Sequence, residues 1–380
     1  MTPVGRFELN WPGDALFGAG RVDGLGTLLA GRGQTRALIV TDPGLREAGV
    51  LARVEAALQA GGVAFDSYDQ VSPNPTTANV RATREIWETG GFDALIALGG
   101  GSSIDTAKGA MAEILTGKEA IACFGQNVDR SDRPLPPFYA IPTTSGTGSE
   151  SSLGAVLKSP ERKFVIRGAL LQPRTVIMDP ELTLSLPPGM TAATGFDAFC
   201  HAIGAYTNTS INPVADELAL AAIRLALEHL PVAVDHGDDL EARSGLMQAS
   251  YLGGVCIGQK GVDGIHGLCT PVESLIPAVH GQVLGTLLPY VLRYNFETQA
   301  KRYAEISKRL GLDGNPVEAI FDAATGLAAL TGCPARLGDY GITQGDIPRL
   351  TEMALLSQAT QRNGREMPAE NITKLYETMI

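Results

Sequence analysis

The chain has 380 residues, of which 44% are hydrophobic and 19% charged, and its formal net charge is −11. A chain of this length favours two domains over one very large core. The acidic balance argues against a nucleic-acid partner, which needs a basic surface. No apolar run is long enough to span a membrane, so we expect no membrane partner.

Short apolar runs alternate with amphipathic stretches in the first half of the chain. The runs that end in turn residues are 37–40, 94–98, 138–141 and 175–178. They are apolar at nearly every position, which is typical of parallel strands that are buried on both faces. Helix-like stretches between them, such as 51–60, indicate βαβ units. We therefore predict an α/β domain over residues 1–186.

The pattern changes after Leu186-Pro187-Pro188-Gly189. Long segments with helical periodicity follow, at residues 213–230, 239–252 and 301–310. Because few strand-like runs occur among them, we predict an all-α domain over residues 187–380.

The cysteines give an expectation about location. They are Cys123, Cys200, Cys256, Cys269 and Cys333, spread widely and without a Cys-x-x-Cys pair. This odd and scattered set fits reduced thiols better than a disulfide framework, so we expect a cytoplasmic protein.

A glycine-rich segment marks the predicted cofactor site. Gly99-Gly100-Gly101-Ser102-Ser103 follows a strand-like run and leads into a helix-like stretch. Glycines allow a ligand to approach the backbone closely, and free N–H groups at a helix N-terminus bind phosphate. The segment therefore predicts a pyrophosphate site in a dinucleotide-binding domain. The alternative is a plain strand-to-helix turn.

Two further positions extend this hypothesis. The polar loop at residues 143–150 also follows a strand-like run, and its hydroxyls could hold the nicotinamide half of a dinucleotide. The alternative is a solvated Ser/Thr turn. Asp42 ends the first strand-like run, where a carboxylate would bind an adenosine ribose and repel a 2′-phosphate. This favours NAD over NADP, although Asp42 could instead be a helix cap.

Three of the five histidines in the chain fall into a candidate metal site with one aspartate. Asp197 and His201 are four residues apart, which on a helix places both side chains on one face. His266 and His280 follow later in the chain. One carboxylate and three imidazoles are suitable ligands for Fe²⁺ or Zn²⁺. The alternative is a set of ordinary histidines that never meet.

Several motifs in fixed order carry a resemblance to a known family. They are residues 99–105, 142–150 and 194–203, followed by His266 and His280 fourteen residues apart. Together they resemble the iron-containing (group III) alcohol dehydrogenase family over nearly the whole chain. The resemblance implies an α/β N-terminal dinucleotide-binding domain and an all-α C-terminal metal-binding domain, an arrangement also called dehydroquinate synthase-like.

The resemblance also implies roles for individual residues. The metal ligands would be Asp197, His201, His266 and His280. The cofactor contacts would be Gly99, Gly100, Gly101, Ser102, Ser103, Thr143, Thr144 and Thr147, with weaker correspondences at Asp42, Asn74, Lys163 and Leu182. A homodimer or larger homo-oligomer is usual among such relatives.

The sequence departs from the family at two positions near the proposed ligands. Many members have a histidine that serves in proton relay where this chain has Thr270, and a threonine hydroxyl can pass a proton but is no base near pH 7. Many members also have glutamate where this chain has Gly204. These changes bear on the substrate and on the proton path.

The function predicted from this resemblance is the interconversion of a small alcohol and its aldehyde or ketone, with NAD(H) and a divalent metal. Lys260, in Gln259-Lys260-Gly261, resembles an element of 4-hydroxybutyrate-type members and could bind the carboxylate of an ω-hydroxy acid or its semialdehyde. The alternative is a surface lysine that pairs with Asp263. Two other functions stay open, namely a dehydroquinate synthase-like lyase that uses NAD and a metal, and a metal-binding relative without catalysis.

Overall fold

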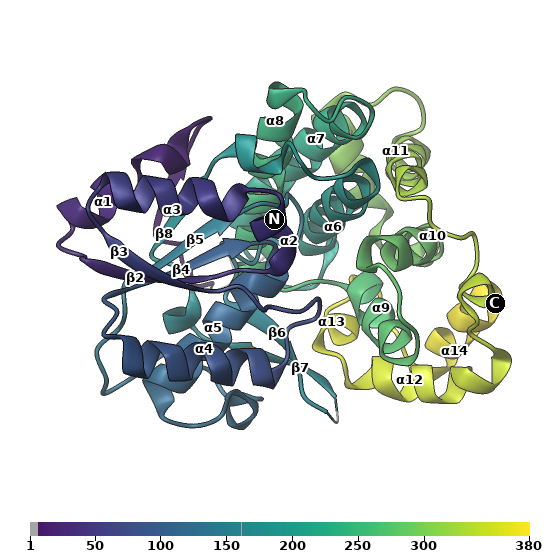
Figure 1. Cartoon of the computed structure of the whole chain (residues 1–380). Coiled ribbons are helices and arrows are strands. Elements are labelled where there is room, and N and C mark those ends of the chain that lie inside the picture. Colours follow the sequence, from purple (N-terminus) through teal and green to yellow (C-terminus); the bar gives the residue numbers. More distant parts are fainter. Residues whose placement is uncertain (1–6, 161) are drawn as a thin grey trace. The chain divides into compact units, whose positions relative to one another are not determined.

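The computed structural model describes residues 7–160 and 162–380 (Figure 1). Contacts between these residues group them into two units. One unit holds residues 10–185, and the other holds residues 7–9 together with 186–380. We propose that these units correspond to two domains with the predicted boundaries, 1–186 and 187–380.

A parallel sheet forms the centre of the first unit. Within the described residues its strands are β1 (Asp14–Phe17), β2 (Arg36–Val40), β3 (Ala64–Tyr68), β4 (Ala94–Gly99), β5 (Phe138–Pro142) and β8 (Thr175–Met178). They are ordered β1-β8-β5-β4-β2-β3, and each neighbouring pair is parallel. Strands β4 and β5 are buried along their whole length, as their apolar sequences predict. The predicted α/β class of this half is confirmed.

Helices cover both faces of the sheet, as Figure 1 shows. They are α1 (Leu25–Gly31), α2 (Pro43–Glu47), α3 (Val50–Ala60), α4 (Thr77–Gly90) and α5 (Gly101–Thr116), and an antiparallel hairpin of β6 (Gly154–Lys158) and β7 (Lys163–Arg167) follows. Leu95 and Ala97 of β4 pack in the apolar core on the side of α4 and α5, whereas Ile96 and Leu98 pack in the core on the side of α1 and α3. The alternation of side chains along a strand produces these two cores.

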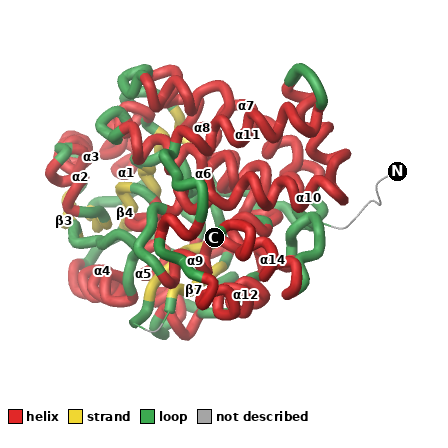
Figure 2. The backbone as a smooth tube through the Cα atoms, turned by 90° about the vertical axis from the view of Figure 1, so that its right-hand side faces the viewer, coloured by secondary structure: helices red, strands yellow, loops and turns green. Residues whose placement is uncertain are grey.

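The second unit is helical from residue 188 onward, as Figure 2 shows. Its helices are α6 (Pro188–Thr207), α7 (Pro213–Asp235), α8 (Leu240–Lys260), α9 (Gly264–Leu275), α10 (His280–Leu310), α11 (Pro316–Leu330), α12 (Ile347–Leu356), α13 (Gln358–Gln361) and α14 (Ala369–Met379). This confirms the predicted all-α class of the second half. Helix α6 is central, because it packs against α7, α8, α9, α10 and α11 and is buried almost all round from Thr191 to Thr207.

Local sequence explains where the helices of this unit begin. Asn212, Asp239 and Asp263 each accept a hydrogen bond from a backbone N–H in the first turn of α7, α8 and α9 respectively. Such side-chain caps satisfy donors that have no partner within the helix. Across the described ranges, no helix combines the length and the apolar character that a membrane span requires.

Candidate active site

The four candidate metal-binding residues lie together in the helical unit. They are Asp197 and His201 on α6, His266 in the first turn of α9, and His280 at the first position of α10. The Nε2 atoms of His201, His266 and His280 lie 3.4, 3.2 and 3.5 Å from Oδ1 of Asp197. Three imidazoles therefore direct the same ring nitrogen at one carboxylate oxygen. We call these four residues the tetrad.

Close helix packing makes this convergence possible. Asp197 and His201 share one face of α6 because they are four residues apart. A Cβ atom on Gly281 would lie 2.1 Å from the carbonyl oxygen of Ala193, so only glycine lets the first turn of α10 approach α6 this closely. That approach brings His280 to the helix that carries Asp197. The rings of His201 and His266 are nearly parallel, with centroids 4.8 Å apart.

The charges in the tetrad suit a cation. Burial alone would raise the pKa of Asp197, but the neighbouring His201, His280 and His266 outweigh it and lower that pKa overall. The ligand atoms of Asp197, His201 and His266 lie within 4.8 Å of one another. A buried carboxylate with several imidazole nitrogens matches the donor set that borderline divalent metals prefer, so the residues present fit the predicted metal.

Thr270 lies one turn after His266 on α9. Its hydroxyl donates a hydrogen bond of 3.2 Å to the backbone carbonyl of His266, a common arrangement for threonine within a helix. Its side chain is exposed. A role in proton transfer therefore stays a prediction, because the hydroxyl would first have to leave the carbonyl.

Gly204 provides room for a buried carboxyl group. A Cβ atom at position 204 would lie 2.8 Å from Oδ1 and 2.9 Å from Cγ of Asp263. Asp263 is almost fully buried, and burial raises its pKa to about 6. The side chain of a glutamate at position 204 would overlap this carboxyl group. The two positions are thus coupled, which is a physical reason for the glycine.

We expect Gly204→Ala to lower the free energy of unfolding by about 1–3 kcal/mol, because the added methyl group overpacks the Asp263 carboxyl group. Urea denaturation would measure this change. In an Asp263→Ala background, Gly204→Ala should lower the free energy of unfolding by clearly less, since the carboxyl group that the methyl group would overlap is gone. Purely additive effects of the two substitutions would contradict the coupling.

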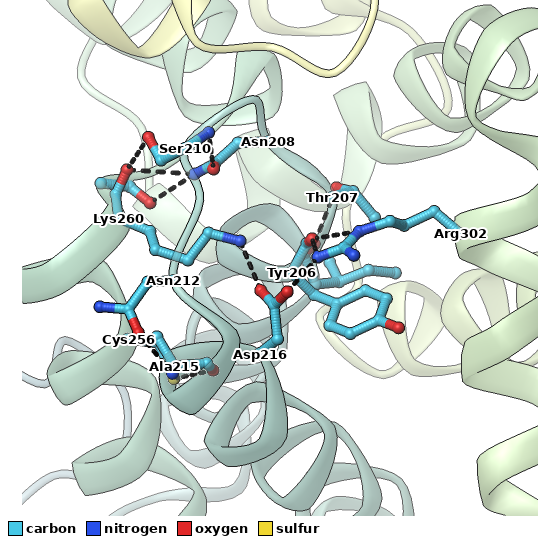
Figure 3. Close-up of polar contacts among 12 residues, drawn as sticks. Tyr206, Thr207, Asn208, Ser210, Asn212, Ala215, Asp216, Cys256, Lys260 and Arg302 are labelled. Carbon is cyan, nitrogen blue, oxygen red and sulfur yellow. Dashed lines mark hydrogen bonds and ion pairs between the residues drawn. The ribbon is translucent and has the colours of Figure 1, made fainter. Parts of the chain in front are cut away.

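Lys260 lies in a buried ion pair with Asp216. Its side chain is fully buried, and its Nζ atom lies 2.5 Å from Oδ1 of Asp216. Arg302 approaches the other oxygen of the same carboxylate, Oδ2, at 2.6 Å (Figure 3). Lys260 is therefore not a surface lysine paired with Asp263. A role in binding a substrate carboxylate stays a prediction, and the ion pair with Asp216 argues against it. Sequence reasoning missed Asp216 because it is 44 residues away in the chain.

This ion-pair network joins the ends of several helices. Lys260 ends α8, and its backbone carbonyl accepts hydrogen bonds from Asn208 and Ser210, which follow α6 (Figure 3). Asp216 lies in the first turn of α7, and Arg302 comes from α10. We infer that the network fixes the far end of the helices that carry the tetrad.

The glycine-rich segment at residues 99–103 and the polar loop at residues 143–150 lie together at the carboxyl ends of the neighbouring strands β4 and β5. The amide of Thr143 donates to the carbonyl of Gly99 at 3.2 Å. A Cβ atom on Gly101 would lie 2.8 Å from Cγ2 of Thr147. Gly99 has a φ of 143°, and its Cβ atom would meet the hydroxyl of Ser103 at 2.6 Å. Glycine at these positions thus lets two predicted cofactor-binding loops touch.

Asp42 lies where the strand order reverses. Chain order runs from β2 to β3 in one direction and from β4 to β5 in the other, so β2 and β4 flank the switch point of the sheet. Ligands of open parallel sheets bind in the crevice at such points. Asp42 also caps α2, because its Oδ1 accepts from the amide of Leu45 at 3.1 Å. The two roles are compatible, since a carboxylate can accept several hydrogen bonds.

Three buried hydroxyl groups mark the same edge of the sheet. The hydroxyls of Thr41, Ser103 and Ser145 have no hydrogen-bond partner among the described residues. They follow β2, β4 and β5 respectively. Buried polar groups are nearly always paired, so such hydroxyls are suited to receive polar groups of a ligand. Ser103 and Ser145 lie in the two segments that the sequence predicted to bind the cofactor. Thr41 was not predicted, although it directly follows a predicted strand.

Buried charged residues on α5 hold the loop that follows Thr147. Asp105 accepts hydrogen bonds from the hydroxyl of Ser149 and the amide of Val156. Lys108 donates to the backbone carbonyls of Ser152 and Gly154, each at 2.8 Å. Burial lowers the pKa of this lysine to about 8. Helix α5 thus carries residues of the glycine-rich segment in its first turn, and its next turns position the polar loop.

The three remaining predicted cofactor-binding residues, Asn74, Lys163 and Leu182, lie in different parts of the first unit. Asn74 is exposed and adopts a φ of 56°, in the loop that pairs with β6 through Pro75 and Lys158. Lys163 lies opposite Lys158 in the β6–β7 hairpin. Leu182 is buried in the apolar core beside α1 and α3, so its side chain has a packing role. Contacts of these three residues with a cofactor stay predictions.

Comparison with known proteins decides the family. Residues 12–180 match the iron-containing alcohol dehydrogenase family model, and residues 191–380 match the model of the family's C-terminal domain. The chain belongs to the iron-containing alcohol dehydrogenase family. The family resemblance drawn from the motifs is thereby confirmed, and the chain is an alcohol dehydrogenase enzyme.

Relatives of this family align over nearly their full length. Lactaldehyde reductase of Escherichia coli K12 is 34% identical over 96% of this chain and 97% of its own. A crystal structure of 1,3-propanediol oxidoreductase superposes with a TM-score of 0.94 at 32% identity, over 99% of this chain and 100% of that chain. Sulfoacetaldehyde reductase from Bifidobacterium kashiwanohense, solved in complex with NAD⁺, has a TM-score of 0.91 at 28% identity, covering 99% of each chain.

Proposed function

We propose that this alcohol dehydrogenase interconverts a small alcohol and its aldehyde or ketone, with NAD(H) as hydride carrier and a divalent metal held by the tetrad. The observation that carries this proposal is the convergence of three imidazole Nε2 atoms on Oδ1 of Asp197 in a buried position. Relatives that reduce lactaldehyde or oxidise propanediol support a small substrate.

The described residues divide the work of such a reaction. A bound divalent cation would supply Lewis acidity at a carbonyl or alkoxide oxygen, and NAD(H) would carry the hydride. Backbone amides at Gly100 and Gly101 bind the pyrophosphate at the N-terminus of α5. The hydroxyls of Thr41, Ser103 and Ser145 receive polar groups of the cofactor. Thr270, one turn after His266 on α9, would pass the proton.

The environment of Lys260 bears on the class of substrate. An ω-hydroxy acid or its semialdehyde would need a free positive charge to bind its carboxylate. The charge of Lys260 is paired with Asp216, so Lys260 gives little reason to favour such a substrate. Lys260→Ala should therefore show no selective rise in KM for such acids over neutral aldehydes. We place neutral alcohols and aldehydes of a few carbons first among candidate substrates.

A single experiment separates the candidate functions. The protein is loaded with Fe²⁺ or Zn²⁺ and mixed with NADH and a panel of small aldehydes, and the absorbance of NADH is followed. A substrate-dependent loss of NADH supports the dehydrogenase. A lyase recycles its NAD within one turnover, and a relative without catalysis produces no change, so no loss with any aldehyde would count against our proposal.

We expect a preference for NADH over NADPH that depends on the carboxylate of Asp42. Asp42→Gly should raise kcat/KM with NADPH relative to NADH by roughly five- to tenfold, because repulsion of the 2′-phosphate is removed. Asp42→Asn is the matched control, since asparagine keeps the cap of α2 but removes the charge. It should shift the preference in the same direction. A wild-type protein that already prefers NADPH would refute the assignment.

We also propose a homodimer or larger assembly in the cytoplasm. The widely spread cysteines, all free in the described residues, support a reducing compartment. Light scattering of the purified protein would measure the mass of the assembly directly.

A further inference from the structure

Glu273 lies behind one of the proposed metal ligands. It is on α9, two turns after His266, and its side chain is only 7% exposed. Its Oε1 atom lies 2.5 Å from Nδ1 of His280. The opposite nitrogen of the same ring, Nε2, faces Oδ1 of Asp197 at 3.5 Å. The imidazole of His280 is thus held between two carboxylates.

The contact with Glu273 determines which ring nitrogen of His280 carries the proton. An ionised carboxylate only accepts hydrogen bonds, so Nδ1 must be the donor. In the neutral imidazole this leaves the lone pair on Nε2, which is the nitrogen that faces the tetrad. The tautomer selected by Glu273 is therefore the one that can bind a metal there.

His280 needs such a restraint more than the other two histidines. Its side chain is 39% exposed, against 8% for His201 and 9% for His266. It also lies at the first residue of α10, whereas His201 lies within α6 and His266 within the first turn of α9. A hydrogen bond from a nearly buried partner on α9 supplies the missing orientation.

We propose that Glu273 is a positioning residue for metal binding: it fixes the Nδ1–H tautomer of His280 and orients the ring so that Nε2 completes the tetrad. This inference rests on the proposed metal site. Some carboxylates accept a hydrogen bond from the ring nitrogen of a ligating histidine that does not face the metal. Mutation of such a carboxylate typically lowers metal affinity by about 10- to 100-fold. Nothing in the sequence pattern marked Glu273, because its partner lies on another helix.

The neighbouring Cys269 raises one alternative. Its sulfur lies 3.6 Å from Nδ1 of His280, and possible ligand atoms of Cys269, Glu273 and His280 lie within 4.8 Å of one another. Such a group could hold a second ion. The distances favour the hydrogen bond, because the 2.5 Å contact between the oxygen and Nδ1 leaves no space for an ion between them.

The test compares metal affinities of the full chain. Metal-free wild type, Glu273→Ala, Glu273→Gln and the exposed neighbour variant Ser274→Ala are titrated with Zn²⁺ against a competing chelator. We expect one tightly bound ion per wild-type chain, and about 10- to 100-fold weaker binding in Glu273→Ala. Glu273→Gln should lose less, since its amide oxygen still accepts from Nδ1–H, and Ser274→Ala should bind like wild type.

Two further readings make the outcome decisive. The thermal unfolding midpoint of each metal-free variant separates a metal-specific effect from a general loss of stability, and the absorption spectrum of the Co²⁺-loaded proteins reports the ligand geometry. Equal affinities of wild type and Glu273→Ala would overturn the role of Glu273 alone. Two ions per wild-type chain, with one lost in Glu273→Ala, would overturn it in favour of a second metal site. A wild type that binds no ion would overturn the proposed function itself.

Discussion

His266→Ala is expected to release most of the bound metal and to lower kcat/KM by about 10³-fold or more. The substitution removes one of four proposed ligands from a buried site. A metal bound there would stabilise charge on the substrate oxygen, an effect worth several kcal/mol. His280→Ala should act in the same direction. Metal content by plasma mass spectrometry and steady-state kinetics with NADH and a small aldehyde would measure both effects.

His236→Ala is the matched control for this prediction. His236 is exposed, follows α7 and lies outside the tetrad, so its loss should leave metal content and kinetics unchanged. If the His266 and His280 variants keep full metal occupancy and activity, the proposed tetrad does not bind the catalytic metal.

Asp216→Ala is expected to lower the free energy of unfolding by about 3–5 kcal/mol. The substitution leaves the ammonium group of Lys260 buried without its counter-charge and removes a partner of Arg302. Urea denaturation followed by circular dichroism would measure the loss. Adding Lys260→Met should restore much of it, because a neutral side chain of similar length then fills the same space.

The adjacent residue supplies the control. Glu217 forms an exposed ion pair with Arg309, and pairs of this kind contribute at most about 1 kcal/mol. Glu217→Ala should therefore have a small effect on the unfolding free energy. A similarly small effect of Asp216→Ala would mean that the charge of Lys260 does not depend on Asp216, and that its assigned structural role is wrong.

Local patterns of sequence determined the class of each half and the composition of the candidate site. Continuous apolar runs identified β2, β4, β5 and β8, because strands buried on both faces exclude polar residues. The partly exposed edge strands β1 and β3 lack that signal. Asp197 and His201 were recognisable because helical periodicity alone places them on one face. The glycines at 99–101 were recognisable because few other contexts need three in succession.

Only the tertiary structure decided which residues meet across long separations in the chain. Lys260 looked accessible in sequence, yet helix packing places Asp216 and Arg302 around it. In the sequence, Gly204 was only a departure from the family pattern. The structure shows that the carboxyl group of Asp263 fills the space beside it. The proposed role of Glu273 depends on His280, which begins the next helix, α10. Each of these depends on how helices pack, which is set by close fit over whole surfaces and leaves no local mark in the sequence.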